Sequence, residues 1–274
     1  MTGSATPALL LVGGGKMGGA MLEGWLKRGI PAGEIAVLDP NPSPWLTNLS
    51  VARGFAVNPA IAPGHAPETL VLAIKPQMLD AAAPALEPLA GPETLAISVL
   101  AGKTIADLKA RMPRLAHIVR AMPNTPAAVG RGITGMAAAP GTSEVAVSRA
   151  KDLLTAIGAV VDVGQESLID AVTAVSGSGP AYVFYLTECL ARAGAALGLP
   201  PNVAAALARA TVEGAGELMF QDRETSPEQL RVNVTSPGGT TAAALGVLMA
   251  PDGLDQLMHR AVAAAHRRAG ELSG

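Results

Sequence analysis

The sequence predicts an α/β protein in two parts: a doubly wound, Rossmann-type sheet over residues 1–164 and an all-helical domain over residues 165–274. Three observations support this fold class. Short apolar runs alternate with helical patterns through the first part, which is typical of a sheet wound with helices. Runs such as Thr69–Ile74 are apolar at successive positions, as expected when helices cover both faces of a parallel sheet. Strand patterns then stop, and long apolar helical patterns fill the rest of the chain.

Each element of the first part has its own local signal. Strands are expected at Ala8–Val12, Glu34–Leu38, Phe55–Val57, Thr69–Ile74, Leu95–Val99, Ile118–Ala121, Gly132–Ala137 and Ala159–Val163. Helices are expected at Lys16–Arg28, Pro44–Arg53, Thr104–Arg111 and Ser143–Ala156. Thr104 and Asp107 resemble a capping box with Asp in place of Glu, which marks a helix start.

The helices of the second part carry few charges. Pro180–Leu197 has only Glu188 and Arg192, and Val203–Met219 is similar. Helices that are apolar on most sides need burial on most sides, which a domain of this size can hardly supply alone. We therefore expect this domain to pack against a second copy of the chain. A large core within one chain is the alternative.

The composition argues against several classes of protein. Charged residues make up 15% of the chain and the net charge is -2, so no basic surface for nucleic acid is expected. The single cysteine, Cys189, cannot form an internal disulfide, and the N-terminal apolar run is too short for an export signal, so a cytoplasmic protein is expected. No apolar run is long enough to predict a membrane helix. No histidines or cysteines have metal-ligand spacing, so no metal site is expected.

A glycine motif follows the first expected strand. Gly13, Gly15 and Gly18 fit G-x-G-x-x-G and open the first expected helix, the context of a dinucleotide site. Their roles are a tight turn, close approach of a pyrophosphate, and packing of helix on strand. Asp39 lies where an acidic residue would bind the adenosine ribose, which favours NAD over NADP. An ordinary Asp-Pro turn is the alternative, and Asn41 or Ser43 could instead donate to a 2′-phosphate.

Two later stretches combine glycines with hydroxyl residues. Val175–Pro180 and Thr235–Thr241 each precede an apolar helical pattern, so both are expected to present hydroxyls and free N–H groups at a helix N-terminus. Such an arrangement caps the helix or binds a small anion. Because capping needs only one Ser or Thr, the second stretch favours an anion site such as one for a carboxylate.

These motifs together resemble those of the pyrroline-5-carboxylate reductase family. VGGGKMG, AIKP, MPNTP, DAVTAVSGSGPAY and SPGGTT occur in this order between about residues 8 and 260. The resemblance implies a Rossmann domain followed by a helical domain that interlocks with its partner in dimers, often assembled into decamers. It implies reduction of a cyclic imine acid to L-proline with NADPH or NADH, the last step of proline biosynthesis, in a pocket completed by the partner's helices.

The resemblance also implies roles for individual residues. It places the cofactor phosphates at Gly13, Gly15, Lys16, Met17 and Gly18, and the adenosine ribose at Asp39, Asn41 and Asn58. The strand ends that would line the cofactor are Ala73, Ile74, Lys75, Pro76, Val99, Leu100 and Ala101, and Asn233 would lie on the nicotinamide side. On the substrate the resemblance places Glu166, Ser236, Gly238, Gly239, Thr240 and Thr241. Thr241 would bind the ring nitrogen and is the expected catalytic residue.

Some residues depart from the family pattern or leave alternatives. Asp39 is unfavourable for the NADPH that many members prefer, and Arg131 has no assigned role. Lys75 is a possible base, but a lysine that merely ends a strand is the preferred interpretation. A β-hydroxyacid dehydrogenase is the nearest enzymatic alternative, yet Pro180–Leu197 lacks the lysine that such an enzyme would carry. A non-catalytic dinucleotide sensor is the alternative outside enzymes.

Overall fold

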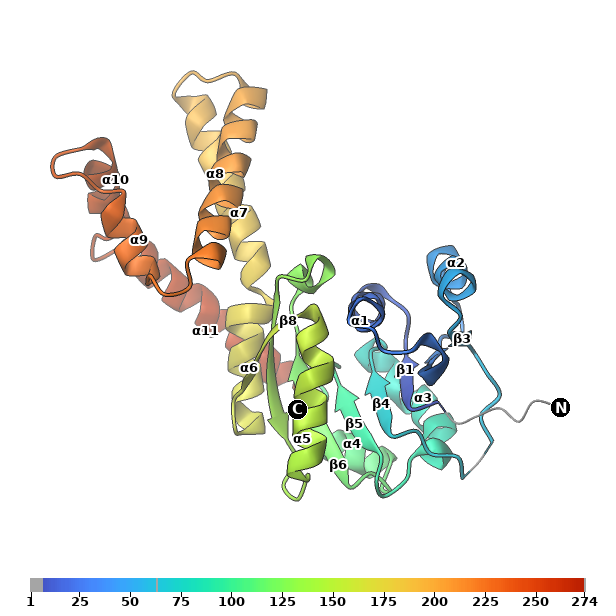
Figure 1. Cartoon of the computed structure of the whole chain (residues 1–274). Coiled ribbons are helices and arrows are strands. Elements are labelled where there is room, and N and C mark those ends of the chain that lie inside the picture. The colour runs from blue at the N-terminus through green and yellow to red at the C-terminus, as the bar shows by residue number, and fades with distance from the viewer. Residues whose placement is uncertain (1–6, 63, 274) are drawn as a thin grey trace. The chain divides into compact units, whose positions relative to one another are not determined.

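The computed structural model describes residues 7–62 and 64–273. The chain packs as two compact units (Figure 1). The first contains the residues up to Gly177 together with those from His266 onward, and the second contains Ser178–Ala265.

A single sheet of eight strands organises the described part of the first unit. In chain order the strands are β1 (Leu9–Val12), β2 (Ile35–Leu38), β3 (Ala56–Val57), β4 (Thr69–Leu72), β5 (Leu95–Ser98), β6 (His117–Met122), β7 (Gly132–Ala138) and β8 (Gly158–Asp162). Their order across the sheet is β3-β2-β1-β4-β5-β6-β7-β8. Every strand expected from the sequence is confirmed, with ends that differ by one or two residues.

The sheet is parallel except where β7 runs antiparallel to β6. The expected doubly wound sheet is confirmed, with β7 and β8 running opposite to the other strands. The connection from Pro123 to Arg131 holds only the short 3-10 helix η4 (Thr125–Val129). A crossover between parallel strands needs about a dozen residues or more, so this connection can only turn the chain back.

Helices cover both faces of the sheet. The first unit contains α1 (Lys16–Lys27), α2 (Pro44–Arg53), α3 (Leu79–Leu86), α4 (Ile105–Arg111) and α5 (Glu144–Leu154), with short 3-10 helices η1 (Ala32–Glu34), η2 (Pro76–Met78), η3 (Glu87–Leu89), η5 (Thr155–Ile157) and η6 (Glu166–Leu168). Alternate residues of β1 enter different cores: Leu9 and Leu11 pack with α1 and α5, whereas Leu10 packs with α3 and α4. The four helices expected in this part are confirmed, as is the capping box of Thr104. Helix α3, which contains Pro84, was not expected from the sequence.

The stretch Val175–Pro180 corrects another expectation. It does not form a loop before a helix, because α6 (Ile169–Val172) continues into a π-helical turn (Thr173–Gly177) and then α7 (Gly179–Ala196). Ile169 belongs to a small buried cluster with Met122 and Ala137 of the sheet. The compact units consequently divide at Gly177, beyond the change of sequence pattern, and the domain limits at residue 164 stay a prediction.

The described residues of the second unit form helices and the loops that join them, with no strand. It contains α7, α8 (Pro201–Gln221), α9 (Pro227–Asn233), α10 (Thr240–Leu248) and α11 (Leu254–Ser273) up to Ala265. Helices α7 and α8 pack side by side as an antiparallel pair (Figure 1). None of the helices that the structure describes is long and apolar enough to cross a membrane.

Candidate active site

The glycine motif forms a tight loop between β1 and α1. Gly13 has φ +99°, and a Cβ there would lie 2.7 Å from the Ala73 carbonyl oxygen. A Cβ on Gly18 would lie 2.0 Å from the Gly13 carbonyl oxygen, so this glycine allows α1 to pack on the loop. A Cβ on Gly15 would meet nothing within 4 Å. The open side of Gly15 is where a pyrophosphate could approach the backbone, so the loop fits a dinucleotide.

The N-terminus of α1 is open to a ligand. The helix begins at Gly15, and no side chain caps its first turn. Its free N–H groups and positive dipole end favour an anion. Lys16 is exposed on this turn, and a hollow of about 410 Å³ beside it is also lined by Ser43 and Trp45. Met17 is partly buried and packs against the core.

Asp39 is fixed at the end of β2 by a network of hydrogen bonds. Its Oδ2 accepts from the Gly14 N–H at 2.8 Å, and its Oδ1 accepts from the Asn41 N–H at 2.9 Å. Asn58, at φ +50°, holds the backbone of Asp39 from both sides: its Oδ1 accepts from the Asp39 N–H at 2.9 Å, and its Nδ2 donates to the Asp39 carbonyl at 2.7 Å. The structure thus brings together the three residues expected at the ribose.

An apolar hollow of about 360 Å³ adjoins this network. Asp39 and Asn58 line it together with Ile74, Met78 and other apolar side chains. A polar rim on an apolar cavity is the usual form of a small-molecule site. This hollow could hold the adenine ring of a dinucleotide whose ribose lies at Asp39.

The remaining strand ends lie along the same edge of the sheet. Ala73–Pro76 follow β4, which pairs with β1, and Val99–Ala101 follow β5, which pairs with β4. The chain order reverses between β1 and β4, and ligands of such sheets bind outside the carboxyl ends of the strands at this point. Lys75 is exposed and lies beyond the end of β4 as the N-cap residue of η2, and its role stays a prediction.

Glu166 makes contacts that the sequence did not predict. Its Oε1 accepts from the Ile105 N–H at 2.7 Å and lies 3.2 Å from Arg120 Nη1. Arg120 is only 3% exposed, and its Nη2 lies 3.4 Å from Asp170 Oδ1 and 3.5 Å from Ser273 Oγ. One oxygen of Glu166 therefore pairs with a buried arginine, while the role of Glu166 at the substrate stays a prediction. A charge within the apolar strand β6 was the signal that could have revealed Arg120.

The SPGGTT stretch lies in the second unit. Gly238 has φ +68°, the Gly239 N–H donates to the Ser236 carbonyl at 3.0 Å, and α10 begins at Gly239. No side chain caps this helix, so the capping alternative is wrong. Thr240 and Thr241 form the uncapped first turn, which suits the carboxylate that the resemblance places there. Asn233, the last residue of α9, accepts through Oδ1 from the Gln229 side chain at 2.8 Å.

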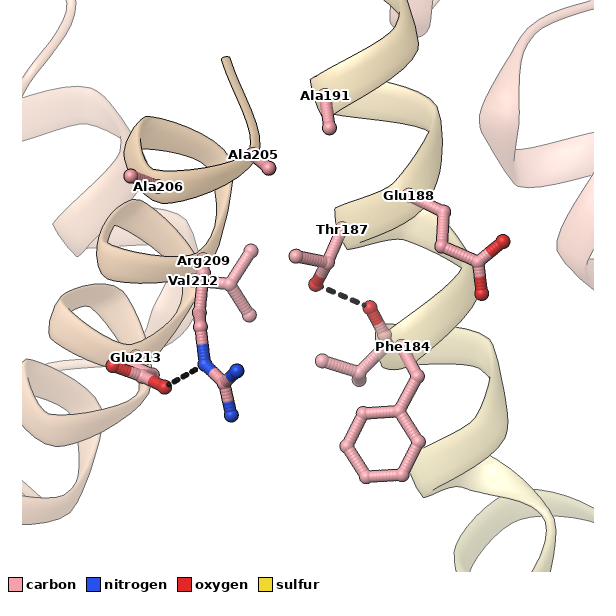
Figure 2. Close-up of a pocket in the computed structure, with 10 residues that line it drawn as sticks. Phe184, Thr187, Glu188, Ala191, Ala205, Ala206, Arg209, Val212 and Glu213 are labelled. Carbon is pink, nitrogen blue, oxygen red and sulfur yellow. Dashed lines mark hydrogen bonds and ion pairs between the residues drawn. The ribbon is translucent and has the colours of Figure 1, made fainter. Parts of the chain in front are cut away.

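The paired helices α7 and α8 expose apolar side chains. A groove of about 620 Å³ runs between them, and Figure 2 shows Thr187 and Ala191 of α7 facing Ala205 and Val212 of α8 across it. No residue of α7 is buried, and Phe184 is 64% exposed. An apolar surface of this kind marks an interaction site.

Comparisons with known proteins agree with these observations. A family model described as "Pyrroline-5-carboxylate reductase dimerisation" matches residues 166–272, and one described as "NADP oxidoreductase coenzyme F420-dependent" matches residues 8–102. The pyrroline-5-carboxylate reductase of Pseudomonas aeruginosa is 37% identical over 98% of each chain. That of Haemophilus influenzae is 39% identical over 96% of this chain and 97% of its own.

Solved structures give the same result. The pyrroline-5-carboxylate reductase of Coxiella burnetii has a TM-score of 0.89 and 33% identity, with 98% of this chain and 99% of that chain covered. The Plasmodium falciparum pyrroline carboxylate reductase, solved with NADP bound, has a TM-score of 0.76 and 25% identity at the same coverage. These matches confirm the predicted fold class, a Rossmann domain followed by a helical domain. The chain therefore belongs to the pyrroline-5-carboxylate reductase family.

Proposed function

We propose that this protein reduces Δ1-pyrroline-5-carboxylate to L-proline with NADPH or NADH, as a cytoplasmic enzyme of proline biosynthesis. Membership of the family over nearly the whole chain supports this activity. The structural observation that carries it is a pair of helix N-termini. Both α1 and α10 begin at a glycine without a side-chain cap, one at the expected phosphate site and one at the expected carboxylate site.

The chain's task in this reaction is to bind, orient and exclude water. The bound dinucleotide supplies the hydride, and a cyclic imine protonates readily, so no strong enzymic acid is needed. In our proposal the backbone N–H groups of the SPGGTT stretch hold the substrate carboxylate. The Thr241 hydroxyl then forms a hydrogen bond with the ring nitrogen and orients the imine carbon toward the nicotinamide. Replacing Thr241 with valine should lower kcat/KM strongly while cofactor affinity stays normal.

The cofactor segments have separate roles in this proposal. The loop from Gly13 to Gly18 and the first turn of α1 bind the pyrophosphate. Asp39, Asn41 and Asn58 bind the adenosine ribose, and the strand ends after β4 and β5 line the path to the nicotinamide. Asp39 presents a carboxylate at the ribose that would repel a 2′-phosphate. We therefore expect NADH to be used better than NADPH.

We further propose a homodimer, which could assemble into a decamer. The exposed apolar face of α7 and α8 supports packing of a second copy, because one copy leaves side chains such as Phe184 and Leu207 largely exposed. Replacing Phe184 with aspartate should then lower the molar mass measured by light scattering. Val51 is 84% exposed on α2 in the first unit, so Val51→Asp is the matched control. An unchanged mass for Phe184→Asp would contradict this interface.

A direct assay tests the activity. Purified protein is mixed with pyrroline-5-carboxylate and either NADPH or NADH, and absorbance of the reduced nicotinamide is followed. Imine-dependent oxidation is expected, and the ratio of the two rates tests the role of Asp39. Cofactor binding without oxidation would favour the dinucleotide sensor instead.

A further inference from the structure

Two sequence motifs far apart in the chain meet in the first unit. MPNTP begins at Met122, the last residue of β6, and SGSGP begins at Ser176 in the π-helical turn Thr173–Gly177. Asn124 Nδ2 of the first lies 3.3 Å from Ser176 Oγ of the second. Asn124 is 9% exposed and Ser176 is half-buried, so this polar pair is partly withdrawn from water. Single π-helical turns within helices are frequent at functional sites, and here the turn brings a hydroxyl to the end of the sheet.

The direction of this hydrogen bond follows from a third group. The Ile133 N–H, which can only donate, lies 3.0 Å from Asn124 and must face its Oδ1. The other end of the amide, Nδ2, therefore faces Ser176 and can only donate. Ser176 Oγ must accept this bond, so its own proton remains available for a different acceptor. Asn124 thus both positions Ser176 and makes it a hydrogen-bond donor.

The Ser176 hydroxyl lies near the carboxyl ends of the parallel strands, where the segments expected to bind the cofactor also lie. Ser98 of β5 pairs with Arg120 of β6, and β6 continues to Met122, level with the segment after β5. A Cβ added to Gly177, the residue after Ser176, would lie 3.9 Å from the Met122 side chain, so this turn lies beside the end of β6. The phosphate loop follows β1 and the ribose network follows β2, so the nicotinamide end of the dinucleotide extends the other way, toward β5 and β6.

We propose that the Ser176 hydroxyl donates a hydrogen bond to the carboxamide oxygen of the nicotinamide. This inference rests on the proposed function, since it assumes the dinucleotide of that reaction. The substrate carboxylate already has its own donors in the SPGGTT stretch, which leaves the carboxamide as the acceptor at this end. A donor there fixes the rotation of the nicotinamide ring and hence the face that it turns toward the imine. Ser176 would be a cofactor-contacting residue and Asn124 its positioning residue.

Dissociation constants for NADH and NADPH, measured by nucleotide fluorescence without substrate, test the contact. Ser176→Ala should raise the dissociation constant for the better cofactor about 3- to 10-fold, the range of one neutral hydrogen bond. Ser178→Ala is the matched control, because Ser178 belongs to the same motif and its side chain caps no helix. The control should bind as the wild type does. Equal binding by Ser176→Ala and the wild type, or an equal loss in both variants, would overturn the proposal.

A cofactor analogue identifies the acceptor atom. In the reduced thionicotinamide dinucleotide a sulfur, a weaker acceptor, replaces the carboxamide oxygen. The wild type should lose affinity on this replacement, whereas Ser176→Ala should lose little more, because the bond is already absent. The same loss in both proteins would show that Ser176 donates elsewhere, for example to the substrate. This readout does not require turnover, so it is separate from failure of the proposed reaction.

Asn124→Asp tests whether the Ser176 hydroxyl donates to the cofactor or only links the two motifs. Aspartate keeps the shape and still accepts from the Ile133 N–H, but it would take the Ser176 proton for itself. If this hydrogen bond only holds the two motifs together, Asn124→Asp would keep it, and cofactor affinity would stay at the wild-type value. We expect instead the affinity of Ser176→Ala, with thermal unfolding checked for each variant. Wild-type affinity in a folded Asn124→Asp protein would refute donation by Ser176.

Discussion

The glycines of the phosphate loop differ in what an added methyl group would meet, and this difference gives a test of the cofactor site. At Gly15 the new carbon would face open space, and at Gly18 it would lie 2.0 Å from the Gly13 carbonyl oxygen. Alanine should therefore impair cofactor binding at the first position and folding at the second.

The magnitude for Gly15→Ala follows from its surroundings. Gly15 has φ -71° and ψ -164°, a conformation that alanine adopts without strain. As an N-cap replacement it should cost about 1 kcal/mol of stability or less, which lowers Tm by roughly 2–4 °C in a chain of this size. The methyl group would occupy the space that a pyrophosphate needs. Loss of one hydrogen bond to a charged group, about 1.5–3 kcal/mol, would raise the cofactor Kd roughly 10- to 150-fold.

Gly18→Ala should behave differently. Because the contact is with a backbone atom, the loop or α1 must move, and overpacking of this kind costs about 1–3 kcal/mol. The expected decrease in Tm is roughly 2–12 °C. Thermal unfolding by circular dichroism and cofactor titration by fluorescence measure both effects. Gly33→Ala, in η1 and with open space at its Cβ, is the control. Wild-type cofactor affinity in Gly15→Ala would refute the assignment of this loop to the pyrophosphate.

Three other changes test separate parts of the molecule. Arg120→Leu leaves the partly exposed carboxylates of Glu166 and Asp170 without their cation, so urea denaturation should show a loss of about 1.5–3 kcal/mol; an unchanged midpoint would contradict the structural role of this ion pair. Burial raises the pKa of Asp107, but hydrogen bonds from Thr104 and nearby basic groups outweigh it and hold the pKa below its ordinary value. This stabilisation is present at neutral pH and is lost as the pH falls through the folded-state pKa, so the Tm difference between wild type and Asp107→Asn should shrink below about pH 4; a constant difference from pH 7 to about pH 2.5 would count against it. Asp39→Ser should shift the ratio of kcat/KM values toward NADPH, and an unchanged ratio would mean that Asp39 serves only the turn.

The sequence alone determined the order of the strands and the location of the cofactor loop. The strands were predictable because their apolar runs are short and bounded by turn residues, and the positions of Gly13, Gly15 and Gly18 follow from steric limits of the local backbone. The start of α4 was predictable for the same reason, since a capping box involves residues three positions apart. Local interactions of this kind involve residues that are close together in the sequence, so the sequence pattern reveals them.

Only the tertiary structure decided which distant residues meet. The ion pair of Arg120 with Glu166 and the hydrogen bond of Asn124 with Ser176 join segments about fifty residues apart, so they depend on strand register and on how α6 packs against the sheet. The reversal of β7 and the π-helical turn in a glycine-rich stretch were also settled by packing. Buried polar groups must find partners wherever the fold places them, and a linear pattern does not contain those distances.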